Sequence, residues 1–504
     1  MAGLEEIAGH LGLGLSVALT PGNVLYCFLG ALLGTLIGVL PGLGPATTIA
    51  MLLPVTFHLS PIGGLIMLAG IYYGAQYGGS ITSILVNIPG ESSSVITCLD
   101  GHAMTRQGRS GAALATAALG SFFAGCVATL LVALFAPPLT DLVQLFGAAE
   151  YFALMALGLV AAIVLAQGSV LKALLMILLG LMLGFVGTDV NSGAHRLTFG
   201  LEGLADGIGF IPLAMGVFGI AEIAVHLERM QGGAAPAAAI TRLWPTRQDF
   251  RQAWPAVLRG TGVGSLLGIL PGGGAILGSF AAYTLEKRLA RDPSRFGQGA
   301  IEGVAAPESA NNAAAQTSFI PLLTLGIPSN GVMALMVGAM MIHGITPGPT
   351  VIDQQPELFW GIIASMWVAN LILVVINLPL VGVWARLTRV PYRILFPAVL
   401  LFCAIGAYSY AHSVFDVVLT MVFGLMGYVL LKLRCEPAPL LLAFVLGPMM
   451  EESLRRALLI GRGDPTVFVT RPLSAAILAV AALLLVVTIL PAVRGLRQTA
   501  FRED

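Results

Sequence analysis

Two stretches of this sequence, GTLIGVLPGLGPA at Gly34–Ala46 and GSLLGILPGGGAI at Gly264–Ile276, are near copies of each other. When Pro41 is aligned with Pro271, the surrounding glycines coincide. Proline removes a backbone N–H and clashes with the preceding helical turn, while glycine permits backbone conformations that other residues avoid. Each stretch therefore predicts a helix broken in the middle of an apolar run. The duplication predicts a chain built from two related halves.

The composition places these breaks inside a lipid bilayer. The 504 residues are 57% hydrophobic and 10% charged, whereas a soluble domain carries about 25% charge. Apolar runs of about 20 residues, the length that crosses the hydrocarbon core, recur along the chain. They are continuously apolar rather than alternating, which favours helices over a barrel. We therefore predict an all-α polytopic membrane protein with about 12–15 hydrophobic segments.

Charge and motif content argue against several classes of function. The 25 Lys and Arg residues balance 25 Asp and Glu residues, which argues against a nucleic-acid partner. The five cysteines lack metal-ligand spacing, so we expect no cofactor and no metal beyond a transported Na⁺. The glycines after Pro271 are not followed by the Lys-Ser/Thr of a phosphate-binding loop. Any transport must then draw its energy from an ion gradient.

One charged gap divides the chain. Residues 228–255 hold several acidic and basic side chains around an Ala/Pro run, and we interpret them as a cytoplasmic linker. The predicted domains are an N-terminal transmembrane repeat at 1–227 and a C-terminal repeat at 256–493, followed by a cytoplasmic tail at 494–504.

Basic residues indicate which loops face the cytoplasm. No Lys or Arg precedes Arg106, so the N-terminus is predicted to be periplasmic, whereas the second half starts from the basic linker. The two repeats are therefore expected to be inverted relative to each other, with the C-terminus in the cytoplasm. The segment Glu451–Arg471 does not fit, because it carries four arginines on the predicted outer side.

A second pair of breaks supports the duplication. GGSITSILVNIPGE at Gly78–Glu91 aligns with TSFIPLLTLGIPSN at Thr317–Asn330 when Pro89 is placed on Pro328. Inverted repeats with matched interruptions are a pattern of secondary transporters, whose binding site lies at the interruptions. We expect broken helices and re-entrant hairpins at these places.

The first breaks suit an anion. A helix restarting near Thr47 would aim its free N–H groups and the positive end of its dipole at a wet cavity. The copy in the second half would do the same from the opposite side, which suits a polycarboxylate. The alternative is a pair of packing kinks. The substrate-binding residues predicted here are Pro41, Gly42, Gly44, Pro271, Gly272 and Gly274.

The second breaks add hydroxyl, amide and carboxyl groups, which bind carboxylates or coordinate Na⁺. Small polar residues also act as helix–helix contacts, and this alternative covers part of the set. Glu222 is either a proton carrier or a residue at a helix end beside the linker. The substrate-binding residues predicted here are Ser80, Thr82, Asn87, Gly90, Ser329 and Asn330, and the coupling-ion residues are Asn87, Glu308, Asn311, Asn312 and Thr317.

An intramembrane protease and a passive channel are the two alternatives to a transporter. Gly461–Asp464 has the Gly-x-Gly-Asp form of some intramembrane aspartyl proteases, but it lies in an arginine-rich stretch with no evident Tyr-Asp partner. A passive anion channel needs a continuous row of polar pore residues, whereas polarity here gathers at two spots. We expect no enzyme activity.

Several long motifs resemble the large membrane subunit of the tripartite tricarboxylate transporters, the TctA family. They lie between residues 22 and about 472, and they include YYGAQYGGSITSILVNIPGE, GTDVNSGAHRLTFGLEGLADGIGF, APESANNAAAQTSFIPLLTLGIPSNG and LGPMMEESLRRALLIGRGD. The resemblance implies a bacterial inner-membrane permease that works with a small four-helix membrane subunit and a periplasmic solute-binding protein. It also implies cation-coupled uptake of a carboxylate, and citrate is only one of the substrates found among members.

Together, the sequence features and the resemblance lead to the hypothesis that the protein is a symporter. Solute passes from the periplasmic protein to a midplane site built by the four breaks, together with Na⁺ or H⁺. One assembly then moves against the rest to give alternating access.

Overall fold

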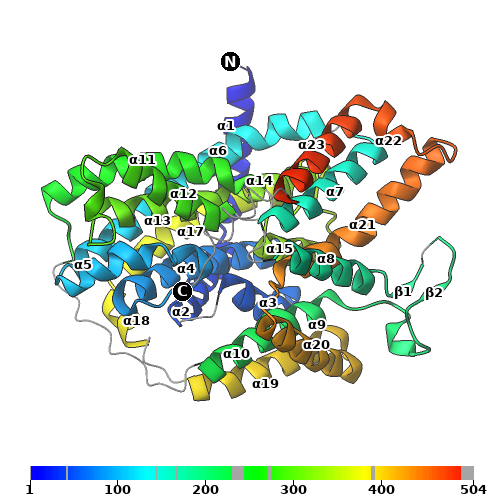
Figure 1. Ribbon diagram of the computed structural model, residues 1–504, viewed down its shortest axis with the longest axis horizontal. Coiled ribbons are helices and arrows are strands. Elements are labelled where there is room, and N and C mark those ends of the chain that lie inside the picture. Colours follow the sequence, from blue (N-terminus) through cyan, green and yellow to red (C-terminus); the bar gives the residue numbers. More distant parts are fainter. Residues whose placement is uncertain are drawn as a thin grey trace.

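The computed structural model describes residues 2–40, 44–143, 145–165, 169–189, 191–229, 243–270, 274–387 and 392–489. These residues form a helical protein with one short hairpin of two strands (Figure 1). The predicted all-helical class is therefore confirmed at the level of secondary structure. The elements up to residue 229 are α1 (Ala2–Ala18), α2 (Pro21–Gly38), α3 (Pro45–Phe57), α4 (Pro61–Val86), η1 (Ser92–Ser94), η2 (Cys98–His102), α5 (Ala103–Arg106), α6 (Ser110–Val143), α7 (Ala148–Leu165), α8 (Val170–Gly184), β1 (Gly187–Thr188), β2 (His195–Arg196), η3 (Glu202–Leu204), α9 (Phe210–Ala214), η4 (Met215–Ile220) and α10 (Ala221–Arg229).

The second half continues the helical pattern. Its elements are α11 (Arg247–Gly268), α12 (Gly274–Leu289), η5 (Pro293–Arg295), α13 (Glu302–Thr317), α14 (Phe319–Leu325), α15 (Gly331–Ile342), α16 (Thr350–Gln354), α17 (Pro356–Asn377), α18 (Val381–Leu387), α19 (Tyr392–Ala411), α20 (Val414–Lys432), α21 (Ala438–Ile460), α22 (Val467–Thr470) and α23 (Pro472–Ile489).

Four helices of the described chain are long and apolar enough to cross a membrane. They cover Pro21–Gly38, Ser110–Thr140, Pro356–Asn377 and Val414–Lys432, and a further seven apolar helices are shorter. Two of the shorter helices, Pro45–Phe57 and Gly331–Ile342, directly follow a break at proline and glycine that divides the apolar run. The inverted orientation of the two halves stays a prediction.

Glycines bring α2 and α4 into close contact. Gly30, Gly34 and Gly38 lie one turn apart on α2 and face the backbone of α4, where a Cβ built on Gly34 would lie 2.8 Å from the Cα of Ile71. No side chain other than hydrogen fits there. Small residues at regular spacing let membrane helices pack backbone to backbone. The helix that leads into the first break is thereby fixed on α4, which carries the second.

The same contact recurs between α11 and α13. Gly260, Gly264 and Gly268 face the backbone of α13, and a Cβ on Gly264 would lie 2.5 Å from the Cα of Ala310. The two halves differ beyond this point. Helix α12 packs along both α11 and α13, whereas α3 packs on α4 and scarcely touches α2. The repeated sequence thus gives a similar helix pair in both halves, but the helix that follows the break packs differently in each half.

The predicted linker is partly helical. Within 228–255, helix α11 begins at Arg247. Its start follows from a capping box, in which the Thr246 hydroxyl accepts from the Asp249 N–H and the Asp249 carboxylate accepts from the Thr246 N–H. Residues 230–242 and the predicted tail at 494–504 lie outside the described residues.

The hairpin of β1 and β2 projects from the helical body near the end of α21 (Figure 1). Ion pairs hold it there: Arg455 on α21 contacts Asp189 at 3.1 Å and Glu451 at 2.6 Å, and Arg196 on β2 contacts both acids. Part of the arginine charge in Glu451–Arg471 is therefore balanced inside the protein.

Candidate functional site

The centres of the two first breaks are not part of the described chain. Pro41, Gly42, Pro271 and Gly272 lie outside the described residues. On the far side of each break the chain returns as a helix. Gly44 caps α3, with Pro45 as its first residue, in place of the predicted restart near Thr47. Proline suits this position because the first N–H of a helix has no intrahelical partner.

The second helix restart is more enclosed than the first. Gly274 begins α12 and is buried, and a Cβ on it would lie 3.1 Å from the Cα of Gly268. A Cβ on Gly44 would meet no atom within 4 Å. The two predicted anion positions are therefore unequal, with the open one at the start of α3.

A carboxylate already lies at the start of α3. The Thr47 hydroxyl donates a hydrogen bond to the Glu222 carboxylate, which α10 brings from the far end of the first half. A negative charge is favoured at this end of a helix by the free N–H groups and the dipole. The structure thus places Glu222 beside the first break rather than only near the linker. The position expected for a substrate carboxylate therefore lies next to the carboxylate of Glu222.

The second breaks share one backbone feature. Helix α4 ends at Asn87 with φ of 60°, and α14 ends at Gly326 with φ of 71°. The alignment of Pro89 with Pro328 pairs these two residues. Asparagine and glycine are the residues that adopt this left-handed conformation most readily. Asn87 is exposed, so its conformation gives it a structural role whatever it binds.

Gly90 lies directly against the end of α2. A Cβ on Gly90 would lie 2.5 Å from the carbonyl oxygen of Gly38 and 2.9 Å from the hydroxyl of Thr82. Thr82 itself donates to the Gly79 carbonyl at 2.9 Å. The first and second breaks of the N-terminal half therefore meet at a point where only glycine fits.

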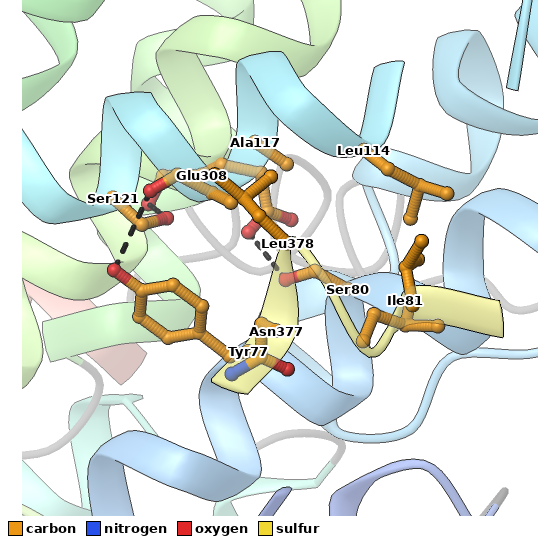
Figure 2. A pocket seen from close by; sticks show the side chains of 11 residues that line it. Tyr77, Ser80, Ile81, Leu114, Ala117, Ser121, Glu308, Asn377 and Leu378 are labelled. Carbon is orange, nitrogen blue, oxygen red and sulfur yellow. Dashed lines mark hydrogen bonds between the residues drawn. The ribbon is translucent and has the colours of Figure 1, made fainter. Parts of the chain in front are cut away.

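Glu308 is the centre of a buried polar cluster. It lies on α13 with 1% of its surface exposed, and its carboxylate accepts a hydrogen bond from the Ser80 hydroxyl (Figure 2). The Thr97 hydroxyl donates a second hydrogen bond to the same carboxylate. Its backbone carbonyl accepts from Asn312 at 3.1 Å and from Ser121 at 3.3 Å. The structure thus brings together Ser80, Glu308 and Asn312 from the predicted sets.

Glu91 is a second carboxylate in this cluster, and the sequence prediction missed it. It accepts from the Asn311 side chain at 3.0 Å and from the Ser93 hydroxyl. The Gln76 carboxamide also adjoins it, and in the orientation that satisfies that amide its nitrogen donates to Glu91 at 2.8 Å. The only sign of Glu91 in the sequence was its place as the acidic residue that ends the NIPGE motif. Its contact with Asn311 depends on α13, which lies far away in the sequence.

The two carboxylates have no basic partner in the described chain. None of the ion pairs formed among the described residues includes Glu91 or Glu308. Unpaired buried charge is costly, so such groups are normally compensated by hydrogen bonds together with a proton or a cation. The cluster is chemically suited to a positively charged ligand.

The remaining predicted residues have local hydrogen-bonding roles. Thr317 donates to the Ala313 carbonyl at 3.1 Å and packs at Gly268, while Ser329 donates to the Ser318 carbonyl at 3.5 Å. Asn330 caps α15 by accepting from the Met333 N–H at 2.9 Å. These contacts fit the alternative that part of the polar set serves helix packing.

Each second break lies against a helix of the other half. The turn η1, which follows Gly90, packs on α12, and α15, which follows Ser329 and Asn330, packs on α3 and α4. The second breaks therefore pack against helices of the opposite half. Their roles in a binding site stay predictions.

Asp464 of the protease-like motif has a different setting. It is exposed in the turn between α21 and α22, where it accepts from the Thr466 N–H at 2.9 Å. This backbone hydrogen bond lowers the pKa of its carboxyl group. The Gly-Arg-Gly-Asp sequence thus forms a helix-ending turn.

Comparison with known proteins gives one family and two close relatives. The model of the tripartite tricarboxylate transporter TctA family matches residues 24–442. An uncharacterised 52.8 kDa protein of the TAR-I ttuC' 3' region in Agrobacterium vitis is 59% identical over 501 residues, covering 99% of this chain and all of that protein. An uncharacterised protein of the TAR-II ttuC' 3' region in the same organism is 61% identical over 241 residues, covering 48% of this chain and all of that protein. No solved structure matches the chain.

Proposed function

The chain belongs to the tripartite tricarboxylate transporter TctA family, and from this we propose that it is the large membrane subunit of a carboxylate importer driven by a cation gradient. This family is a transporter family, which implies a multi-pass transport protein rather than an enzyme. The observation that carries the finer proposal is the polar cluster around the half-buried Glu91 and the buried Glu308. Two carboxylates without a basic partner suit a coupling cation, Na⁺ or H⁺.

The proposed route begins outside the membrane. A periplasmic solute-binding protein delivers a tricarboxylate or another carboxylate, and a small four-helix membrane subunit completes the complex. The substrate meets the free N–H groups at the starts of α3 and α12, beside the Pro-Gly breaks. Ser80, Thr82, Gly90, Ser329 and Asn330 line the second breaks and complete the site. One group of helices then moves against the rest to expose the site to the cytoplasm.

The coupling cation has a separate place in this proposal. We assign it to the α13 region with Glu308, Asn311, Asn312 and Thr317, together with Asn87 at the end of α4. A cation bound beside an anionic substrate offsets charge that neither ligand could bring into the membrane alone. A passive anion channel is the competing function, and it predicts flux without any gradient.

Uptake into vesicles tests the proposal. The complex is reconstituted with its solute-binding protein, and uptake of radiolabelled citrate and a panel of other carboxylates is followed with and without an inward Na⁺ or H⁺ gradient. We expect accumulation above equilibrium only with a cation gradient. Equilibration that does not depend on any gradient would support the channel instead.

A pair of variants tests the site. Gly42→Val and Gly272→Val are each expected to abolish uptake while membrane insertion, followed by immunoblotting of the membrane fraction, stays normal. Normal uptake in both variants would remove the first breaks from the site. Glu308→Gln should change the dependence of uptake on the coupling cation, and an unchanged dependence would argue against its role.

A further inference from the structure

The segment between α8 and α9 projects from the helical body and carries exposed apolar side chains (Figure 1). We call this segment, residues 185–189 and 191–209, the α8–α9 loop; it includes the hairpin of β1 and β2. Phe199 is 84% exposed, Leu201 52% and Leu197 44%, and these three residues are named the apolar patch. Exposed apolar groups are ordinary on helices that face lipid, but on a projecting loop they indicate a surface that a partner covers.

The rest of the α8–α9 loop is polar, which places it outside the hydrocarbon layer. The residues on both sides of the apolar patch include several that are exposed and polar, namely Asn191, Ser192, His195, Glu202 and Asp206. Charged side chains are costly within a bilayer. An apolar centre with a polar rim is the arrangement found in interfaces between proteins. The patch therefore has the character of a docking surface rather than of a face buried in lipid.

The backbone holds two residues of the apolar patch in a conformation that bulky residues avoid. Leu197 and Phe199 each have a φ of 52°. This left-handed region is unfavourable for a residue with a Cβ, and only glycine enters it freely. Burial does not offset the cost, because both side chains are exposed. Strain of this kind is concentrated at segments that bind ligands or partners.

Ion pairs fix the α8–α9 loop on the helical body. Arg196 contacts Glu451 of α21 at 3.0 Å, and Asp189 contacts Arg455 of the same helix at 3.1 Å. Leu204 is buried where the chain returns towards α9. The patch is thus presented on a loop that is already held in place. A preformed surface loses little conformational freedom when a partner binds, which favours affinity.

The α8–α9 loop lies across the membrane from the basic segments of the chain. The helical run of α9, η4 and α10 starts at Phe210, directly after the loop, and ends at Arg229, within the basic linker. At 1.5 Å per residue this run is about 30 Å long, which is the thickness of the hydrocarbon core. Helices α5 and α18, which carry Arg106 and Arg386, also lie at the far end of the molecule from the hairpin (Figure 1). Because basic segments face the cytoplasm, the loop is expected on the periplasmic side.

The same helical run connects the α8–α9 loop with the proposed substrate site. Its second element, η4, packs on α3. The Thr47 hydroxyl at the start of α3 donates to Glu222, which lies further along the run. A partner held by the loop is therefore joined to the first break through one continuous stretch of helix.

The exposed charge of the α8–α9 loop is acidic. Glu202 and Asp206 are exposed, and neither forms an ion pair within the described part of the chain. Arg196 is already paired with Asp189 and Glu451. Anionic lipid headgroups attract clusters of basic residues, which this loop lacks. Its charge instead suits a protein that presents basic groups around an apolar pocket.

We propose that the apolar patch is the docking surface for the periplasmic solute-binding protein. Phe199 is the anchor that enters an apolar pocket of that protein, and Glu202 and Asp206 face basic groups around the pocket. Exposed aromatic residues of this kind contribute a large share of the affinity in protein interfaces. The inference rests on the proposed function, because it names the surface at which a partner of that function binds.

Binding without substrate or gradient tests the proposal. The complex is immobilised in nanodiscs, and the probe is the purified solute-binding protein used in the uptake assay, with Kd and rates followed by biolayer interferometry. Phe199→Ala should raise Kd about tenfold or more. The double variant Glu202→Gln/Asp206→Asn should lower the association rate and reduce its dependence on salt.

Glycine at position 199 separates docking from folding. Phe199→Gly removes the ring and also relieves the left-handed strain, so Kd should rise as in Phe199→Ala while Tm stays unchanged or increases. A merely structural role would instead lower Tm. The matched control is Phe250→Ala, since Phe250 is also exposed but lies on α11 beside the basic linker. This variant should keep the wild-type Kd.

Three outcomes would overturn the proposal. The wild-type complex could fail to bind the probe; Phe199→Ala and Phe199→Gly could bind with the wild-type Kd, as expected if the patch contacts lipid or a second copy of the chain; or Phe250→Ala could lose as much affinity as they do. Because the binding assay contains no gradient, normal binding by the Phe199 variants would leave cation-coupled uptake intact. Failure of uptake by a wild-type complex that binds through Phe199 would in turn leave the docking surface standing.

Discussion

Two glycines on α11, Gly264 and Gly262, are predicted to change the stability of the protein in opposite directions when each is replaced by alanine. Gly264 is buried, and the Cβ of an alanine there would overlap the carbonyl oxygen of Ala310 and lie 2.5 Å from its Cα. Overpacking costs about 1–3 kcal/mol. Backbone atoms have no rotamer into which to retreat, so the upper part of this range applies. Alanine regains at most about 1 kcal/mol of helix propensity, which leaves a net loss of about 2 kcal/mol.

Gly262 is the matched control on the same helix. It is exposed, and a Cβ built there meets no atom within 4 Å. Only the propensity term remains, because nothing has to move. Gly262→Ala should therefore stabilise the protein by about 0.5–1 kcal/mol. The two substitutions are chemically identical and two residues apart, yet they should change stability in opposite directions.

The measurement is the unfolding of purified protein in detergent, with Gly264→Ala, Gly262→Ala and the wild-type chain compared side by side. Uptake in vesicles should fall in Gly264→Ala, because Ala310 lies between Glu308 and Asn311 on α13 and a displaced helix moves both side chains. If both alanines stabilise the protein, or if both destabilise it equally, the close packing of α11 on α13 is refuted.

Two further predictions concern Asp100 and Asp189, two buried acids that accept several hydrogen bonds. Asp100→Ala should destabilise the protein by at least about 3 kcal/mol in detergent unfolding, because the Asp100 carboxylate accepts from three backbone N–H groups at 2.8–2.9 Å that would be left unpaired. Replacement of the exposed Asp292 by alanine is the control. An equal effect of the two substitutions would contradict the reasoning. The pKa of Asp189 is lowered to about 2 by hydrogen bonds from Ser192 and a backbone N–H and by Arg455, so its ionised form stabilises the fold above the usual Asp pKa, and this contribution is lost as pH falls towards 2. Asp189→Asn should therefore lower Tm at pH 7 and have little effect near pH 2, and a constant difference across that range would refute the assignment.

Local chemistry accounts for the part of the fold that the sequence predicted. Single prolines such as Pro54 and Pro307 lie inside continuous helices, so a proline alone does not mark a break. Clusters of proline and glycine that recur in both halves do mark one, and they allowed the four interrupted segments to be located without a structure. The pairing of Asn87 with Gly326 also follows from the alignment of Pro89 with Pro328, and both residues adopt a left-handed backbone. Helix ends are decided within a few residues, which is the range over which sequence patterns are informative.

Side-chain partners across the fold could not be predicted in this way. Glu91 follows a Pro-Gly pair, and an acid in that position is typical of an exposed turn. It is instead half-buried and accepts a hydrogen bond from Asn311, which belongs to the other half of the chain. For Glu222 the sequence left open a proton carrier or a residue at a helix end, and it did not predict the contact with Thr47 beside the first break. Contacts between segments far apart in the sequence depend on how the helices pack.

The distribution of charge gives a physical reason for coupled transport. Three carboxylates, Glu91, Glu222 and Glu308, lie beside the breaks at which an anionic substrate is proposed to bind. None of them forms an ion pair with a basic side chain in the described part of the chain. An incoming carboxylate therefore adds negative charge to a region that already holds it, at a cost that rises as water is excluded. In the proposed symport, cations that bind first would reverse this balance, so that binding of the substrate and of the cation would favour each other by linkage. The same electrostatics would disfavour uncoupled movement of either ligand.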